Sequence, residues 1–347
     1  CVPVKAELVW QDAPSLVTDI KYNSGTNGGT ISFKVDKENI RQGNALIAIK
    51  DSQNTILWSW HIWITDENIY HTIKVTNHQN VSHDLMPIHL GWCEGEVINY
   101  AARSCQVQFI AHGQTRLITV NQMRSTTSTQ GNCTFYEWGR KDPLRPSSGY
   151  AYKNKTWYNA AGIASTANHA VESFPFGNEC IKNYIRKPDV MQKEIGGDNT
   201  YFNLWNADNN TNSNVYNDNP VTKTVYDPCP VGFAMPPSNT FTGFTTTGEN
   251  VTNTVAKYNG EWNSSLPGWN FYCGPNKTGG TIFFPMTGER ISSGGHLSAV
   301  GSLGHTWSAT STHSNYAHNL TLYTNYWVWP LDRFSKSAGH GVRPCLE

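Results

Sequence analysis

The sequence predicts a mainly β chain, with a small β-sandwich over residues 1–67 and a loop-rich part of α+β character over residues 68–347. Two observations predict this division. Short stretches of strand character, separated by turn-forming "NSGTNGG" and "RQGN", fill the N-terminal part. After Asp66 such stretches become sparse and helical periodicity is weak. A length of 347 residues suits about two domains or one large elaborated domain.

The N-terminal part contains five expected strands: AELVW, LVTDIKYN, GTISFKV, NALIAIK and TILWSWHIWIT. The last strand alternates, with Trp58, Trp60, Ile62 and Ile64 on one face and His61 on the other. We expect Trp58 and Trp60 to belong to the sandwich core. We interpret His61 as a surface or hydrogen-bonded residue, not as a ligand.

The second part contains one expected hairpin, one expected helix and several short strands. The stretch QVQFIAHGQTRLITV, residues 106–120, predicts a hairpin because its apolar residues alternate on both sides of the turn HGQT. In NECIKNYIRKPDV, Ile181, Tyr184 and Ile185 recur at helical spacing before Pro188 ends the helix. Further strands are expected in HTIKV, TIFFP, HTWSAT and AHNLTLY.

Composition and missing motifs argue against several function classes. The 26 basic and 26 acidic residues cancel, so no net field attracts nucleic acid or an anionic membrane. The longest apolar run, ILWSWHIWI, is far shorter than the ~20 residues of a membrane-spanning helix. No Walker loop, G-x-S-x-G, H-E-x-x-H or Rossmann fingerprint occurs, and we expect no cofactor.

The stretch ADNNTNSNVYNDN resembles a calcium-binding loop because Asp208, Asn210 and Asn212 stand at alternate positions. It departs from an EF-hand at Ser213, where glycine makes the turn, and at Asn219, where a bidentate glutamate binds the ion. We interpret the stretch as an Asn-rich solvated loop and expect no metal, with an irregular calcium site as the alternative.

The eight cysteines are an even number and include no C-x-x-C pair, which argues against zinc-ribbon and thioredoxin-like sites. Disulfides are the better interpretation, and they imply an oxidising compartment. Cys229 stands in the rigid stretch DPCPVGF, where the residues alone allow a nucleophile, a metal ligand or half of a disulfide. Cys1 is compatible with a lipid-modified N-terminus, a disulfide partner or a boundary within a longer chain.

Several segments together resemble one group of proteins: TILWSWHIWITD, FYEWGRKDP, TVYDPCPVGFAMPPS and the C-terminal series HTWSAT, AHNLTLY and GHGVRPC. They resemble surface and fimbrial-tip proteins of gut Gram-negative anaerobes that carry the so-called major paralogous domain. That domain is related to the C-type-lectin-like fold of formylglycine-generating enzymes and phage receptor-binding variable proteins. The resemblance implies that residues 68–347 form a C-type-lectin-like domain. The chain departs from the family at LMPIHLGWC, where the family commonly has MDRNLGA, and at the closing VRPCLE.

The resemblance also implies a structural role for Cys229. It makes Cys229 a half-cystine that ties the Pro-rich segment to the end of the domain. Cys345 is the implied partner, because a C-type-lectin-like fold brings its termini together. Such a bond would constrain the unfolded chain by ~4–5 kcal/mol.

The resemblance implies a non-enzymatic adhesin at the cell surface or a fimbrial tip, which binds a host or microbial surface glycan or protein. The first alternative is a structural pilus or surface subunit that contacts other pilus subunits and has no separate ligand. The second is an enzyme of the formylglycine-generating type. That chemistry uses a closely spaced cysteine pair near the C-terminus or a copper-binding equivalent, whereas Cys345 has no near neighbour in sequence.

In the implied fold, the binding site is identified by its position in the fold more than by any motif. This position corresponds to residues 311–338. This segment is dense in Asn, Tyr, His and Trp, whose rigid rings and amide groups suit recognition of a glycan or a protein. We expect Leu320 and Leu322 to belong to a core strand, and Pro330 to keep its stretch a loop or an edge. The expected ligand-binding residues are Asn315, Tyr316, Asn325, Tyr326, Trp327, Trp329 and Asp332.

Overall fold

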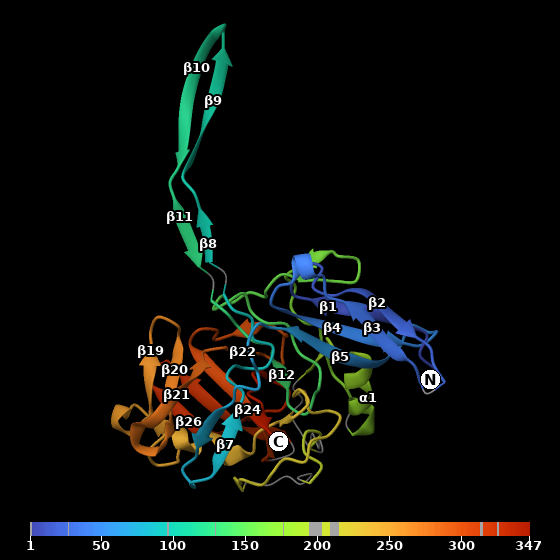
Figure 1. The fold of residues 1–347 in the computed structure, drawn as a ribbon, viewed down its shortest axis with the longest axis vertical. Helices are drawn as coiled ribbons and strands as arrows, with labels where there is room; N and C mark the ends of the chain where they lie inside the picture. The colour runs from blue at the N-terminus through green and yellow to red at the C-terminus, as the bar shows by residue number, and fades with distance from the viewer. Residues whose placement is uncertain are drawn as a thin grey trace.

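The computed structural model describes the whole chain except residues 1, 27, 96, 129, 176, 194–202, 209–214, 313–314 and 325. Cys1 and Asn325, together with Asn210, Asn212 and Ser213 of the Asn-rich stretch, therefore lie outside the described residues. The fold is mainly β, as predicted (Figure 1). No helix among the described residues is long and apolar enough to cross a membrane.

The first 67 residues supply most of a five-stranded antiparallel sheet with the order β14-β13-β1-β4-β5. All five strands expected there are confirmed: β1 Lys5–Gln11, β2 Thr18–Asn23, β3 Thr30–Lys34, β4 Gly43–Lys50 and β5 Ile56–Ile64. The β2–β3 hairpin forms a separate two-stranded sheet, and its apolar side chains share one core with those of β4 and β5. Two further strands, β13 Trp157–Tyr158 and β14 Ala164–Ser165, join the large sheet from far along the chain. Residues 1–67 therefore do not complete their own sheet.

The expected placement of two tryptophans on β5 is wrong. Ile62 and Ile64 pack against the core of the N-terminal sheets, but Trp60 is 39% exposed and lines a groove of about 540 Å³ beside the β2–β3 hairpin. Trp58 packs instead against the second part of the chain, with its ring 6.0 Å from that of Tyr226. The alternation on β5 was predicted correctly, but the β2–β3 hairpin leaves Trp60 partly uncovered.

Hydrogen bonds join the N-terminal sheet to the rest of the chain. The Trp63 indole donates to the carbonyl of Trp92, with 2.9 Å between the two atoms. His61 is hydrogen-bonded, as expected: one ring nitrogen lies 2.9 Å from Asn44 Oδ1 and the other 3.0 Å from the Tyr136 hydroxyl. Burial lowers the pKa of His61 to about 3, so its imidazole is neutral at pH 7.

The C-terminal part packs four small sheets around two aromatic-rich cores. Their orders are β18-β26-β25-β24, β19-β20-β21, β17-β28-β7-β6 and β12-β27-β22-β23. The strands not yet named in these sheets are β6 Ile73–Thr76, β7 Ser82–Leu85, β12 Tyr136–Glu137, β17 Phe233–Ala234, β18 Val251–Thr252, β19 Gly260–Asn263, β20 Gly268–Gly274, β21 Thr278–Pro285, β22 Glu289–Arg290, β23 Leu297–Ser298, β24 Leu303–Ser311, β25 Tyr316–Tyr323, β26 Trp327–Ser335, β27 Gly339–His340 and β28 Cys345–Leu346. The predicted helix is confirmed as α1 Asn178–Arg186, which buries Cys180 and Tyr184, and β15 Val171–Glu172 pairs with β16 Met191–Gln192.

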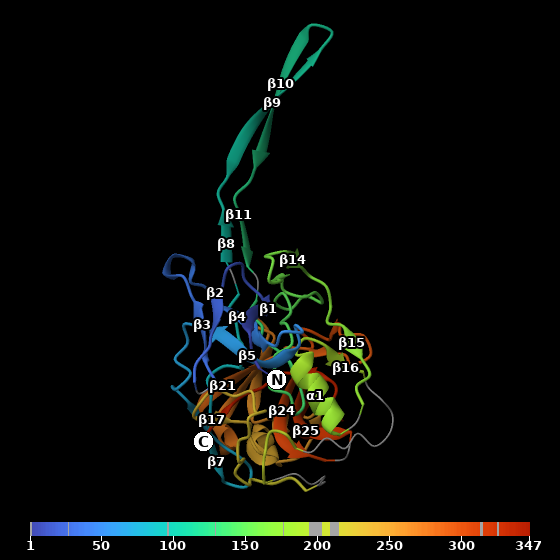
Figure 2. The same ribbon diagram turned by 90° about the vertical axis from the view of Figure 1, so that its right-hand side faces the viewer.

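The expected hairpin at residues 106–120 is confirmed, but it forms no part of a core. It consists of β9 Arg103–Ala111 and β10 Gln114–Gln122, and β8 Val97–Tyr100 with β11 Ser125–Ser128 continues it toward the body. We call residues 97–128 the arm. Figures 1 and 2 show the arm projecting away from the body, and every residue of β9 and β10 is exposed.

All seven cysteines within the described residues are free thiols, so the expected disulfide between Cys229 and Cys345 is not formed in this structure. The Pro-rich segment is nevertheless tied to the chain end. β17 pairs with β28 through Ala234 opposite Cys345. Strand pairing therefore makes the connection that the resemblance assigned to a disulfide.

Candidate functional site

The segment expected to bind ligand forms two strands of the sheet β18-β26-β25-β24. The expectation of a loop at Pro330 is wrong, since β26 runs through it from Trp327 to Ser335. The alternative of an edge agrees with the pairing, because β18 pairs only with Trp327 and Val328 and ends before Pro330. The pairing of β25 with β26 shifts register between Asn319 and Thr321, and Pro330 is skipped at this shift. The shift explains how a strand tolerates a residue that cannot donate to the ladder.

A row of four aromatic side chains lies at one end of this sheet. We call it the aromatic ladder; it consists of Tyr323, Tyr326, Trp327 and Trp329. The rings of Trp327 and Trp329 stack with centroids 4.7 Å apart and planes at 7°. Tyr323 lies 4.9 Å from Trp327 and 6.0 Å from Tyr326. Tyr326 is 52% exposed and the other three rings are half-buried, so the ladder presents aromatic surface to solvent.

The opposite face of the same strands supports the ladder. Leu320, Leu322 and Val328 are buried in one aromatic-rich core, and the prediction that the two leucines are core residues is confirmed. The Trp329 indole donates to Thr252 Oγ1 over 2.9 Å. These contacts fix the ring positions before any ligand arrives, which lowers the entropy cost of binding.

The structure does not bring all of the expected site residues together. Tyr316 pairs with Ser335, whereas the ladder begins where Tyr323 pairs with Trp327, so the two ends lie about 25 Å apart along the strands. Tyr316 is 41% exposed and Asn315 half-buried at that far end.

Asp332 lies between these two ends and faces inward. Its carboxylate accepts a hydrogen bond from Thr321 Oγ1 at 2.7 Å. Burial raises the pKa of Asp332, and the bond from Thr321 acts in the opposite direction. Asp332 therefore belongs to the interior polar network and not to the ladder.

A cleft of about 550 Å³ lies near the base of the arm and is lined by Asp12, Cys93, Glu94 and Lys155 among others. Two of its charged groups, Asp12 and Lys155, pair with each other. Asp12 accepts from the backbone and side-chain amides of Asn44, at 2.7 and 3.0 Å, and lies 3.4 Å from Lys155 Nζ. These two groups therefore have few hydrogen bonds left to offer a ligand.

The thiols do not favour catalysis. Burial raises the pKa of Cys93, Cys133 and Cys345 to about 12 in each case, and it also raises the pKa of Cys229 well above its usual value. A nucleophilic cysteine needs the thiolate, which these environments disfavour at neutral pH. Cys105 is the exposed one among the described cysteines, and it stands on the arm.

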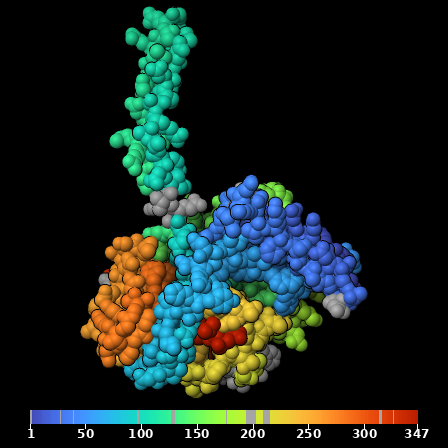
Figure 3. Space-filling view, in the orientation of Figure 1, coloured from blue at the N-terminus to red at the C-terminus, as the bar shows by residue number. Residues whose placement is uncertain are grey.

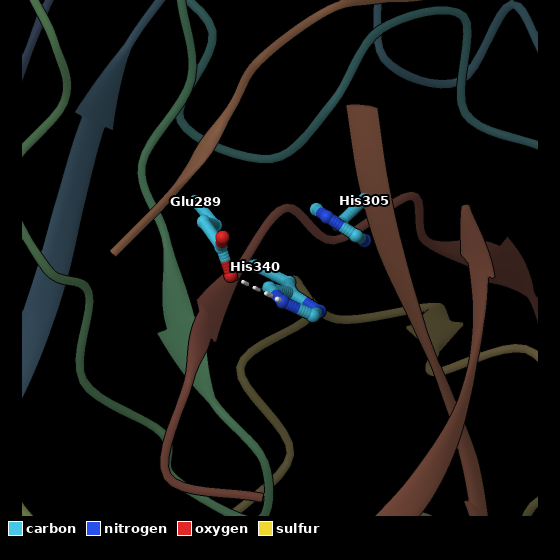
Figure 4. A group of neighbouring side chains, drawn as sticks. All are labelled: Glu289, His305 and His340. Carbon is cyan, nitrogen blue, oxygen red and sulfur yellow. Dashed lines mark ion pairs between the residues drawn. The ribbon is translucent and has the colours of Figure 1, made fainter. Parts of the chain in front are cut away.

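Sequence reasoning missed two sets of residues. Tyr323 is the last residue of the expected strand AHNLTLY. Its aromatic side chain is the only sequence signal for a place in the ladder. Glu289, His305 and His340 form a cluster whose ligand atoms lie within 4.8 Å of one another (Figure 4). These three residues are far apart in sequence and have no recognisable spacing, so only the sheet topology reveals them.

Comparison with known proteins gives no further guide: no family model, curated protein or solved structure matches this chain.

Proposed function

We propose that this chain is a non-enzymatic adhesin of a cell surface or fimbrial tip, which binds a surface glycan through the aromatic ladder. The observation that carries the proposal is the stacked row of half-exposed rings on a sheet whose other face is core. The motif resemblance supports the cellular setting. The buried thiols support a binding role over thiol catalysis.

A glycan fits this surface better than a charged ligand does. Trp327 and Trp329 offer flat apolar faces, on which the C–H face of a sugar ring can stack. The polar groups beside them on and after β18 are neutral hydroxyl and amide groups, including those of Thr252 and Asn253. Such groups supply the few hydrogen bonds that orient a ligand in an aromatic site.

A glycan array with the full chain tests the proposal, followed by Trp327→Ala and Trp329→Ala. Each substitution should weaken binding by ~2 kcal/mol or more, as removal of a central aromatic side chain does in other interfaces. The melting temperature should stay within a few degrees of the native value, because both rings are half-exposed.

Trp60→Ala is the matched control, since Trp60 is an exposed tryptophan on a different sheet and should not affect binding. If the chain binds a protein receptor and no glycan on the array, the ligand is a protein and not a glycan. A large drop in melting temperature in both ladder variants would indicate that the two tryptophan rings act as core residues that stabilise the fold. The proposed adhesin would then have no identified binding site.

The arm favours a second candidate function, a structural subunit that associates with a neighbouring subunit. Paired residues of β9 and β10 share a face, so the register places Cys105, Val107, Phe109, Ile118 and Val120 on one side, together with Arg103 and Arg116. The other side carries mostly Ser, Thr, Asn and Gln, with Ile110 and Leu117 among them. We call the first side the apolar side. No other strand or core among the described residues covers the apolar side. Figure 3 shows the arm standing clear of the body.

Charge indicates what kind of subunit would cover the arm. The arm carries Arg103, Arg116 and Arg124 and no acidic residue. Two arms packed against each other would bring like charges together, so the partner surface is apolar with an acidic rim, on a different subunit.

Ile118→Asn should abolish such association in cross-linking on intact cells and leave the melting temperature of the purified chain unchanged. Thr119→Asn changes the polar side of the same strand and is the control. Association that survives Ile118→Asn would exclude the apolar side of the arm as the contact.

A further inference from the structure

A cluster of two histidines and one glutamate lies where three strands of the C-terminal part meet. Glu289 comes from β22, His305 from β24 and His340 from β27 (Figure 4). His305 and His340 are 2% and 0% exposed, and the Glu289 side chain is 13% exposed. One ligand atom from each residue lies within 4.8 Å of the other two.

The imidazole rings of this cluster have unsatisfied nitrogens. No hydrogen-bond partner within the described residues meets His305 Nε2 or either ring nitrogen of His340. The Glu289 carboxylate lies 3.8 Å from His340 Nε2, which is too far for a hydrogen bond. Buried polar atoms without a partner are rare in native proteins and point to a missing ligand.

Two side chains hold the other ring nitrogen of His305. Thr321 Oγ1 lies 3.0 Å from His305 Nδ1, and Asn319 Nδ2 lies 3.2 Å from the same nitrogen. Thr321 Oγ1 in turn donates to the Asp332 carboxylate. These contacts orient the ring, and Nε2 is the nitrogen without a partner among the described residues. Outer partners of this kind orient metal-binding histidines.

His340 stacks on two neighbouring rings. Its ring lies between the Trp307 ring, at 4.2 Å and 25°, and the His305 ring, at 4.3 Å and 12°. Burial lowers the pKa of both histidines.

We propose that Glu289, His305 and His340 bind one divalent transition-metal ion of the zinc class. Two imidazoles and one carboxylate form a ligand set that zinc accepts, whereas calcium and magnesium require oxygen ligands. Ligands at ~2.0–2.2 Å from zinc lie about 3.4 Å apart, so binding draws the three ligand atoms together. It also turns the two stacked imidazoles out of their parallel arrangement, because a metal ion lies in the plane of each imidazole that binds it. The ion links β22, β24 and β27 and satisfies the buried nitrogens. Solvent reaches it through the partly exposed Glu289 side.

The test uses the full chain after treatment with a chelator, titrated with Zn²⁺ and separately with Co²⁺. We expect one ion per chain and a rise of several degrees in the melting temperature. The Co²⁺ spectrum should indicate tetrahedral nitrogen and oxygen ligands without a thiolate charge-transfer band, which separates this site from the buried cysteines. A native chain that binds no ion in a one-to-one ratio, or binds it through sulfur, overturns the proposal.

Two substitutions locate the site. Glu289→Gln should weaken Zn²⁺ binding at least ~10-fold, and Asp332→Asn should do so through the orientation of His305, since loss of an outer partner lowers metal affinity ~10–100-fold. Glu261→Gln, an exposed glutamate on β19, is the control and should bind as the native chain does. Because Glu289 is partly exposed, its variant should fold even where a histidine variant does not. Unchanged affinity in Glu289→Gln contradicts the assignment.

Discussion

The arm and the sheet that carries the aromatic ladder both expose apolar side chains on antiparallel strands. They differ in what lies behind those side chains. The ladder stands on strands whose other face holds Leu320, Leu322 and Val328 in a closed core. The arm has solvent on both faces along all of β9 and β10.

The two proposed binding surfaces differ accordingly. A surface supported by a core is ordered before its ligand arrives, which suits recognition of a rigid small ligand. A two-stranded hairpin without a third strand or a packed face is at best marginally stable in water, so a partner that covers the arm also stabilises it. The following substitutions test the comparison with the same change in both regions.

The largest difference is expected for leucine to alanine. Leu322 is 2% exposed behind the ladder, and Leu322→Ala should lower the free energy of unfolding by ~2–5 kcal/mol because it leaves a cavity. Leu117 is 62% exposed on the arm, and Leu117→Ala should change it by less than ~0.5 kcal/mol. Urea denaturation of both variants measures the two changes in the free energy of unfolding. Equal losses would show that the arm folds onto the body.

The two regions also show what the sequence could predict. Alternation at residues 106–120 predicts a hairpin, and the structure confirms it. The same alternation does not reveal whether the apolar side meets a core or solvent, which is why Trp60 on β5 was misplaced. The alternation of apolar and polar residues is a property of a single strand, whereas the burial of that strand depends on which other segment covers it.

The candidate site was also predictable only in part, because a local sequence pattern does not reveal which segments meet in space. The density of aromatic residues pointed to Tyr326, Trp327 and Trp329, which do lie in one row. The register shift at Pro330 sends Asp332 inward, and no local pattern predicts that shift. His305 and His340 meet only because β24 and β27 are neighbours in space, since Thr306 pairs with Gly341.

Acid should destabilise the body and spare the arm. His61 is held neutral in the folded state, with its pKa lowered from 6.5 to about 3, so the unfolded chain binds more protons between these values. The free energy of unfolding should therefore be fully retained above pH 6.5 and fall as the pH drops toward 3, by up to ~1.4 kcal/mol per pH unit for each such histidine. His89 and His169, whose pKa values burial also lowers, act in the same direction.

Urea denaturation at a series of pH values, with a chelator present, measures this slope. His61→Gln should make it shallower, because one titrating group is removed. His112 stands exposed at the tip of the arm, and His112→Gln should leave the slope unchanged. A native chain with no loss of stability between pH 6.5 and 4 would mean that the buried histidines are protonated in the folded state.

The smallest effect is expected at two glycines with the same backbone strain. Gly113 in the turn of the arm has φ +73° and Gly162 in the turn between β13 and β14 has φ +74°, and both have open space where a Cβ would stand. Alanine should therefore cost about 1–2 kcal/mol of local strain at either position, with no clash.

In Gly162→Ala this strain should lower the free energy of unfolding of the whole chain, because β13 is hydrogen-bonded to β1. In Gly113→Ala it should only open the hairpin, since nothing else among the described residues depends on the arm. Hydrogen exchange should then speed up in the amides of β9 and β10 while the melting temperature stays the same. A lower melting temperature in Gly113→Ala would show that the arm is coupled to the body and that the contrast between the two regions is overstated.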